Sequence, residues 1–138
     1  RTQEEVRRVL ASEYGLGPGG LKGNDDTGQM SAWYVFSAIG LYPVSPGSPH
    51  YEIGSPLFEE ARIDVGGGRT FTVRAPGASA SNLYIQSATL DGRPHERPWI
   101  AHADVARGAT LELRMGPRPH RAWGVRPEDA PPSLSTTR

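Results

Sequence analysis

The sequence predicts an α+β fragment in which two helices precede a small antiparallel β-sheet region. Apolar residues recur with helical spacing up to about residue 44, and after Pro46 they alternate with polar residues, as in half-buried strands. Most of the 13 prolines and many of the 17 glycines lie in this second part, which indicates frequent turns. We therefore divide the chain into terminal helices (1–44), a β region (45–125) and a Pro/Ser/Thr-rich flexible tail (126–138).

The composition fits one ordinary globular domain and argues against several function classes. The 138 residues are 36% hydrophobic and 22% charged, with a formal net charge of +0, which disfavours a nucleic-acid partner. No apolar run approaches the roughly 18 residues of a membrane span, and no cysteine provides disulfides or thiolate metal ligands. Arg1–Glu5 is charged from its first residue and is not a signal peptide, so we expect the chain to be cut from a longer protein.

The first helix is predicted to start at Thr2, near the beginning of the chain. Threonine is a good N-cap, and Glu5 follows three residues later, as in a capping box. The helix should end near Tyr14–Gly15, where glycine can adopt a left-handed cap. The glycine-rich stretch that follows, up to Gly20, is then a loop.

The second helix is predicted to begin at Asp26, with Gln29 completing another capping box. Between Met30 and Tyr42 apolar residues occupy every side of this helix, so we expect it to be buried on all faces. Pro43 should end it, because proline lacks the N–H group that would continue the helical hydrogen bonds.

The strands of the β region are predicted from alternating apolar residues and turn signals. The segment 61–75 reads as a hairpin around Gly66–Gly68. Another strand covers Leu83–Ala88 and is followed by an Asp91–Gly92 turn. A further half-buried strand covers Leu111–Met115.

One loop carries most of the chemical information. Asn24, Asp25 and Asp26 stand between two glycines, and the loop runs directly into the apolar second helix. Charged residues are seldom placed beside a buried helix unless something holds them at a site. Backbone N–H groups and the helix dipole favour an ionised carboxylate at a helix N-terminus, which suits a general base. The plain alternative is that Asp26 is only an N-cap.

The longer string around this loop resembles a known enzyme family. Gly23–Phe36 (GNDDTGQMSAWYVF), continued by Tyr51–Phe58, closely resembles the C-terminal end of the glycoside hydrolase family 92 α-mannosidases. The resemblance covers about Leu21 to Gly124. It implies that the two helices are the last helical pair of an (α/α)6 barrel and that the strands follow this barrel.

The resemblance also implies an activity. Family members are inverting, calcium-dependent exo-α-mannosidases, mostly specific for α-1,2 links, that remove terminal mannose from N-glycans or mannans. The expected location is secreted, periplasmic or cell-envelope. The expected partners are a mannose-containing glycan and the remainder of the same polypeptide, which would supply the missing barrel helices and an N-terminal β-sandwich.

The roles of the acidic loop follow from the chemistry and the resemblance together. Inverting hydrolysis needs two carboxyl groups roughly 6.5–9.5 Å apart. The side chains of Asp25 and Asp26 are adjacent and usually diverge, so they cannot easily play both parts. The resemblance places the general base on Asp26 and keeps Asp25 as a second catalytic candidate. Asn24, where some relatives carry an acid, and Asp25 are candidate sugar or calcium ligands, because calcium prefers hard oxygen donors. The full set of metal ligands stays unknown.

The general acid is not predicted within this chain. In the family it is a glutamate from earlier in the barrel, and no motif here matches it. Six glutamates lie on the first helix or after the barrel and make unconvincing donors: Glu4, Glu5, Glu13, Glu52, Glu59 and Glu60. We therefore expect the chain to hold half of an active site and to be inactive alone.

The tryptophans, Tyr34 and the histidines have simpler structural interpretations. Trp33 and Tyr34 could stack on a sugar, but in so apolar a helix we interpret them as core. Trp99 and Trp123 are expected to seal the sheet, and the four histidines lack zinc-site spacing.

The alternative function is a non-catalytic β module that binds carbohydrate or packs on a partner. A third interpretation is a truncated product whose apolar helix surface is exposed.

Overall fold

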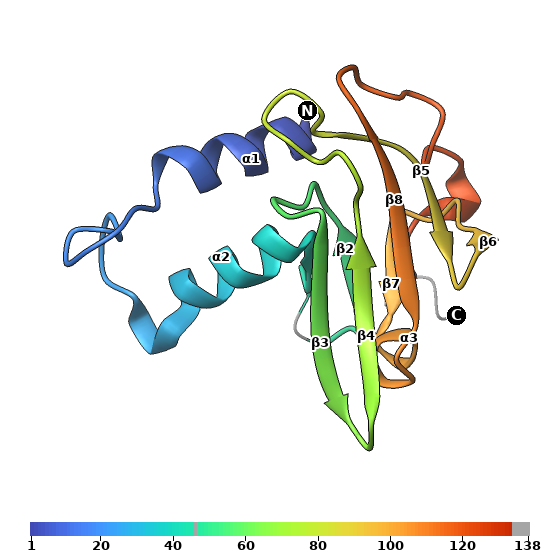
Figure 1. Cartoon of the computed structure of the whole chain (residues 1–138), viewed down its shortest axis with the longest axis horizontal. Helices are drawn as coiled ribbons and strands as arrows, with labels where there is room; N and C mark the ends of the chain where they lie inside the picture. Colours follow the sequence, from blue (N-terminus) through green and yellow to red (C-terminus); the bar gives the residue numbers. More distant parts are fainter. Residues whose placement is uncertain (46, 134–138) are drawn as a thin grey trace.

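The computed structural model describes residues 1–45 and 47–133. Two helices extend as an arm from a β-rich body, and the loop that joins them lies at the far end of this arm (Figure 1). The α+β class predicted from the sequence is therefore confirmed. The acidic loop belongs to the tip of the arm, away from the strands (Figure 1).

Helix α1 spans Thr2–Ser12. Thr2 is its first helical residue, because the carbonyl of Arg1 already accepts a hydrogen bond from the backbone N–H of Glu5 at 2.9 Å. The prediction that Thr2 is the N-cap is therefore wrong by one residue. The helix ends close to the predicted Tyr14–Gly15 boundary, and Leu10 is its buried residue.

Helix α2 spans Gln29–Ile39 and follows a short 3₁₀ turn, η1, at Asp26–Gly28. It ends at Gly40, whose left-handed φ of 87° forms the C-cap. A Cβ atom at this position would lie 3.0 Å from the Cβ of Pro56. Both the left-handed φ and the lack of space for a side chain therefore favour glycine. The helix thus ends before Pro43, and the continuation to Tyr42 predicted from the sequence is wrong.

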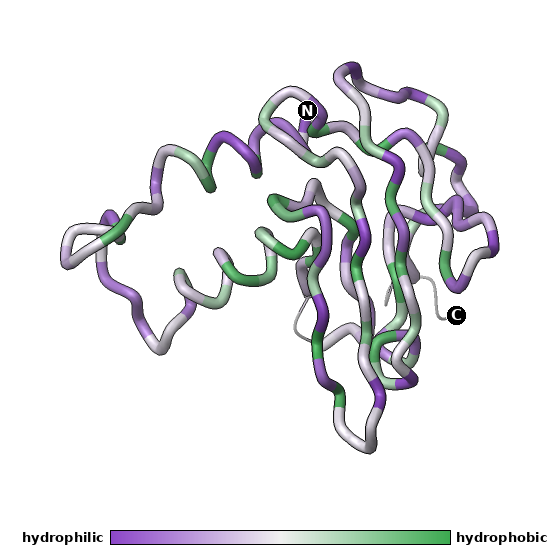
Figure 2. Tube along the Cα trace, viewed as in Figure 1, coloured by the Kyte–Doolittle hydropathy of each residue, from purple (hydrophilic) through white to green (hydrophobic). Residues whose placement is uncertain are grey.

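The surface of α2 is only partly covered by this chain. Among the described residues of α2, Ser37 and Ala38 are buried, whereas Val35 is 57% exposed. Figure 2 shows that α2 is nevertheless rich in apolar residues, while α1 is more hydrophilic. The expectation of burial on all faces is wrong for this segment, because the rest of the chain packs against one side of the helix.

The described residues form two sheets. In the three-stranded sheet, β2 lies between β1 and β7; in the five-stranded sheet the order is β3-β4-β8-β5-β6. A short helix, α3 (His102–Ala106), follows β7, and a 3₁₀ turn, η2 (Pro127–Asp129), follows β8. The strand bounds are β1 Leu41–Tyr42, β2 His50–Ile53, β3 Glu60–Gly66, β4 Arg69–Arg74, β5 Tyr84–Leu90, β6 Arg93–Pro94, β7 Trp99–Ala101 and β8 Thr110–Gly116.

The sequence predicted one hairpin correctly but not the direction of every strand. β3 and β4 pair across Gly66–Gly68, as expected, and the predicted Asp91–Gly92 turn joins β5 to a further short strand, β6, that was not predicted. β4 and β8, however, run parallel, with Thr72 opposite Thr110, so the larger sheet is mixed and not antiparallel. Alternation reveals which face of a strand is buried; it does not give the direction of a neighbour reached through a long connection.

One hydrophobic core joins the two sheets. Its fully buried members include Phe71 and Ile100, one from each sheet. Trp99 and Trp123 are only 7% and 8% exposed, which confirms that they seal the sheets. Part of the predicted tail is also folded: the carbonyl of Asp129 accepts a hydrogen bond from the Trp99 indole N–H at 2.9 Å. Residues 134–138 lie outside the described residues.

Helix α1 is tied to the β body by polar side chains. The Arg7 guanidinium donates hydrogen bonds to the carbonyl of Pro56 and, at 2.8 Å, to that of Ser79. The side-chain oxygen of Gln3 accepts a hydrogen bond from the backbone N–H of Ile85 at 3.0 Å. These contacts join residues far apart in the sequence and fix the base of the arm.

We predict that Arg7→Ala destabilises the full-length protein by about 1–3 kcal/mol, because it leaves two half-buried carbonyl groups without their charged donor. The measurement is chemical denaturation followed by circular dichroism. Arg8→Ala is the matched control: Arg8 pairs only with the exposed Glu5 in the described chain, so its loss should cost less than about 0.5 kcal/mol. Equal effects of the two substitutions would contradict the anchoring role of Arg7.

Candidate active site

The acidic loop enters α2 through a tight turn. Gly28 donates its backbone N–H to the carbonyl of Asp25 at 3.0 Å, and Asp26–Gly28 form the turn η1. Thr27 has a φ of 56°, in the left-handed region, and Gly28 follows with a φ of 78°. For threonine this conformation costs on the order of 1–2 kcal/mol, so other interactions must hold the loop in place.

Asp25 makes those interactions. Its Oδ1 accepts hydrogen bonds from the backbone N–H groups of Met30 (2.7 Å) and Ser31 (3.1 Å), and its Oδ2 accepts one from the Ser31 hydroxyl at 2.5 Å. The Ser31 hydroxyl bond, followed by the backbone N–H bonds, lowers the pKa of Asp25 below its ordinary value of 3.8. Asp25 therefore caps the first turn of α2 as an ionised carboxylate.

This arrangement overturns one prediction. The sequence suggested that Asp26 caps the second helix in a box with Gln29, but the turn η1 separates Asp26 from the first turn of α2. Within the described residues, the Asp26 side chain makes no hydrogen bond or ion pair, and it is exposed. The interpretation of Asp26 as an N-cap therefore does not hold, and its carboxylate is open to water or a ligand.

Asn24 lies beside this pair and is also exposed. In the described part of the chain its side chain has no hydrogen-bonding partner, so its amide oxygen and nitrogen are open to solvent. The loop thus presents the side chains of Asn24 and Asp26 outward, while that of Asp25 turns back to the helix. The three neighbouring polar residues do not share one environment.

Aromatic rings pack behind the loop. Tyr14 stacks on Trp33, with ring centroids 5.7 Å apart and an interplanar angle of 9°, and its centroid lies 5.0 Å from that of Tyr34. The Tyr14 hydroxyl donates a hydrogen bond to the carbonyl of Met30 at 3.0 Å. Trp33 and Tyr34 are half-buried, so they pack in an aromatic cluster at the helix surface and not in the core.

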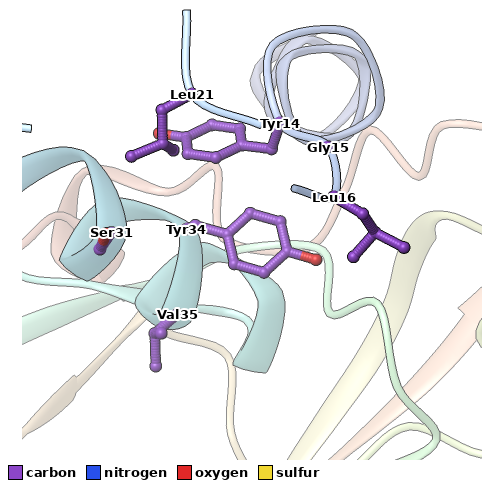
Figure 3. Close-up of a pocket in the computed structure, with 7 residues that line it drawn as sticks. All are labelled: Tyr14, Gly15, Leu16, Leu21, Ser31, Tyr34 and Val35. Atoms are coloured by element: carbon purple, nitrogen blue, oxygen red, sulfur yellow. The ribbon is translucent and has the colours of Figure 1, made fainter. Parts of the chain in front are cut away.

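A pocket of about 430 Å³ opens beside the loop. Figure 3 shows Tyr14, Leu16 and Leu21, from the loop that follows α1, around Tyr34 of α2, and Val35 also lines the pocket. The Ser31 side chain lines the same pocket, so the hydroxyl that binds Asp25 lies at its edge. Leu16 is fully exposed in this chain, which leaves one wall of the pocket open.

Comparisons with known proteins identify the family. Residues 1–117 match the sequence model described as the glycosyl hydrolase family 92 catalytic domain. The chain belongs to glycoside hydrolase family 92. It is 42% identical over 118 residues to a protein of Arthroderma benhamiae named as an uncharacterized secreted glycosidase, a match that covers 83% of this chain and 15% of that protein.

Solved structures of family 92 enzymes have the same fold in this region. A family GH92 inverting mannosidase from Bacteroides thetaiotaomicron matches with a TM-score of 0.90 and 42% identity, covering 97% of this chain and 18% of that one. A second GH92 α-mannosidase of this bacterium, solved in complex with mannoimidazole, matches with a TM-score of 0.90 and 36% identity, over 96% and 17% of the two chains. This chain therefore spans less than a fifth of each of these relatives.

The family 92 match, over residues 1–117, includes the two helices of the arm, α3 and all eight strands of the described chain. This favours a segment of an enzyme over a separate β module, because a module would not require the helical arm. None of the described helices has the length and apolar character needed to cross a bilayer. The described residues also contain no group of three or more His, Asp or Glu side chains arranged to hold a metal ion.

Two glutamates near the arm differ in their environments. Glu13 pairs with Lys22 at 3.3 Å, and the Ser12 hydroxyl and Lys22 lower its pKa, which does not suit a proton donor. Burial raises the pKa of Glu52, but Glu52 lines a different pocket, of about 390 Å³, together with Trp33 and Trp123. None of the acidic-loop residues lines that second pocket.

We predict a pH-dependent contribution of Asp25 to stability. Its folded-state pKa is below 3.8, so the stabilisation is complete above this pH and is lost as the pH falls through the folded-state pKa. The full-length protein should unfold at a higher temperature than Asp25→Asn at neutral pH, and this difference should shrink in acid.

The measurement is the unfolding temperature of both proteins from about pH 7 to about pH 1.5, so that the series passes through the lowered folded-state pKa of Asp25. Glu112→Gln is the control, because the exposed side chain of Glu112 makes no hydrogen bond or ion pair among the described residues. A difference between wild type and Asp25→Asn that stays constant over this range would show that the charge of Asp25 is not what stabilises the turn.

Proposed function

We propose that this chain is the C-terminal part of the catalytic domain of an inverting exo-α-mannosidase and that Asp26 is its general base. One observation supports the assignment most directly. Of the two adjacent carboxylates, Asp25 is engaged by Met30 and Ser31, whereas Asp26 is exposed and makes no side-chain contact of this kind in the described chain. A base must have at least one carboxylate oxygen available to bind the attacking water.

The proposed reaction uses two carboxyl groups, one as general base and the other as general acid. Asp26 accepts a proton from a water molecule, whose oxygen attacks the anomeric carbon from the face opposite the leaving group. A carboxylic acid on the other side gives its proton to the glycosidic oxygen as the bond from the anomeric carbon breaks. The positive end of the α2 dipole lies near the loop and favours negative charge there.

The acid, and the rest of the sugar site, come from other parts of the polypeptide. We place α1 and α2 as the last helical pair of an (α/α)6 barrel, with a preceding glutamate as the general acid and a β-sandwich at the N-terminal side. The exposed apolar residues of α2 and the loop, such as Val35 and Leu16, support this placement because further helices would cover them. The chain alone should then be inactive.

The substrate and location follow from the family. We propose that the enzyme removes terminal mannose from N-glycans or mannans, mainly at α-1,2 links, and that it acts outside the cytoplasm. The Arthroderma relative is named a secreted glycosidase, and one of the similar mannosidases was solved with mannoimidazole. These names support a mannose-type substrate and a secreted or cell-envelope location.

Calcium is proposed as the cofactor from the family resemblance. The acidic side chains of the described residues do not by themselves form a calcium site, because Asp25 is already engaged and no three His, Asp or Glu side chains among them are grouped to hold a metal ion. Asn24 has an exposed side-chain oxygen that would fit such an ion, together with donors from elsewhere in the polypeptide. Bound calcium would hold sugar hydroxyls; the proton transfer at Asp26 does not pass through it.

We predict that Asp26→Asn in the full-length protein lowers kcat for an α-mannoside by about 10²–10⁴-fold, the usual loss when general base catalysis is removed. Stability should change by less than about 0.5 kcal/mol, since the residue is exposed and unpaired in the described chain. The matched control is Asp64→Asn on the β3–β4 hairpin, which should keep wild-type turnover. Near-normal turnover of Asp26→Asn would place the base elsewhere.

We also predict that removing calcium inhibits the full-length enzyme. Dialysis against a calcium chelator should abolish most mannosidase activity, and added calcium should restore it more effectively than magnesium, which prefers a smaller octahedral site. The measurement is turnover alongside the metal content of the protein. Full activity in metal-free enzyme would remove calcium from the mechanism while leaving the role of Asp26 intact.

A further inference from the structure

The carboxylate of Asp26 is held only through the backbone on which it stands. Its side chain makes no hydrogen bond or ion pair among the described residues, so its direction depends on the conformation of the loop. That loop is closed by Asp25, whose Oδ1 reaches the backbone N–H of Met30, five residues later. Asp26 lies inside the ring formed by this contact. Anything that loosens the ring would also move the Asp26 carboxylate.

Ser31 supplies two of the three hydrogen bonds that close the ring. Its backbone N–H and its hydroxyl bind different oxygens of the Asp25 carboxylate. The backbone bond is present with any residue at this position, but the hydroxyl bond is specific to serine or threonine. It fixes the second carboxylate oxygen and so prevents the group from rotating. The Ser31 side chain is exposed and lines the pocket of Figure 3, so its hydroxyl is not needed to fill the core.

Tyr14 holds the same turn from the other side. The N–H of Met30 is bound by Asp25, and the carbonyl of Met30 accepts the hydrogen bond from the Tyr14 hydroxyl. The Tyr14 ring is kept in place by stacking on Trp33. Tyr14 lies just after α1, outside the acidic motif, and the fold brings it to the start of α2. The peptide groups on both sides of Met30 are thus tied to side chains from two separate segments.

We propose that Ser31 and Tyr14 are positioning residues that set the direction of the Asp26 carboxylate, Ser31 through Asp25 and Tyr14 through Met30. This inference rests on the proposed role of Asp26 as general base. Neither side chain has to touch the reacting atoms. A base misplaced by about 1 Å can lose up to about 10²-fold in rate, whereas binding of the sugar by other parts of the protein is unaffected. The expected signature is therefore a loss in kcat without a matching change in KM.

The test uses the full-length enzyme with substitutions that remove single hydroxyl groups. Ser31→Ala and Tyr14→Phe should each lower kcat by about 10–100-fold, with KM within about two-fold of wild type. Ser31→Thr, which keeps the hydroxyl, should recover most of the kcat. Asp26→Asn is measured in parallel, and in that background Ser31→Ala should cost little further activity, because the residue it positions has already lost its function.

Two controls separate positioning from general stability. Ser12→Ala removes a hydroxyl that binds the side chain of Glu13. Tyr42→Phe removes a hydroxyl that has no hydrogen-bonding partner in the described chain, and it keeps a ring that, like that of Tyr14, contacts Trp33. Both should keep wild-type kcat. The inference is overturned if Ser31→Ala and Tyr14→Phe keep wild-type kcat, if only KM changes, or if a folded Ser31→Thr is as impaired as Ser31→Ala.

The two proposals fail in different ways. If Asp26→Asn is inactive but the Ser31 and Tyr14 variants are normal, the base assignment stands and the positioning role is wrong. If Asp26→Asn is active, the base lies elsewhere, and the positioning role for Asp26 falls with it.

Discussion

The hydrogen bonds accepted by the Asp25 carboxylate are the interaction on which this site depends. The first N–H groups of any helix lack partners within the helix, and at α2 two of them are bound by Asp25. The same bonds offset the cost of the left-handed Thr27, which turns the chain between the acidic pair and the helix. Without this carboxylate, the turn η1 would keep the backbone hydrogen bond from Gly28 to Asp25 but lose the contacts that join Asp25 to the first turn of α2. The position of Asp26 is therefore a consequence of the capping of α2.

The arm that carries this loop is joined to the β body by two kinds of contact. Arg7, in the middle of α1, binds carbonyl groups of the body, and aromatic rings connect α2 to the smaller sheet. Phe36 contacts both Tyr42 and Tyr51, with centroids 6.4 and 6.1 Å apart. Together with the contacts of Trp33, this gives a row of ring contacts from Tyr14, which also binds the carbonyl of Met30, to Tyr51 of β2. The smaller sheet thus supports the end of the arm that carries the acidic loop.

Much of this fold could be predicted from local sequence patterns. The β3–β4 hairpin combines alternating apolar residues with three consecutive glycines at its turn, and both signals are local in the sequence. The end of α2 was harder to predict, because a helix can end at either Gly40 or Pro43. The helix ends at Gly40, where Pro56, which is distant in the sequence, approaches closely. The parallel pairing of β4 and β8 likewise depends on a long connection and leaves no local signal.

In the candidate site, too, local sequence patterns did not predict which single residue has which role. Asp25 and Asp26 both stand near the start of a helix, and the spacing to Gln29 pointed to Asp26 as the cap. That spacing assumes that the helix starts directly after the acid, whereas a 3₁₀ turn intervenes and moves the cap one residue back. A possible signal was Ser31, whose hydroxyl is well placed to bind an acid six residues earlier once the turn is present. The folded tail at Asp129 was missed for a similar reason, since its partner Trp99 is 30 residues away.

The two adjacent acids of the loop lie in different environments. Here the charge of Asp25 is balanced by N–H and hydroxyl donors, and that of Asp26 faces solvent. Asp25 thus has a structural role at the start of α2, and Asp26 is the carboxylate to which we assign the proposed base. Under the proposed inverting mechanism, the proton donor on the other side of the scissile bond is a second carboxyl group from a separate element. This requirement agrees with a chain that spans less than a fifth of its solved relatives and leaves the apolar surface of α2 open to the rest of the enzyme.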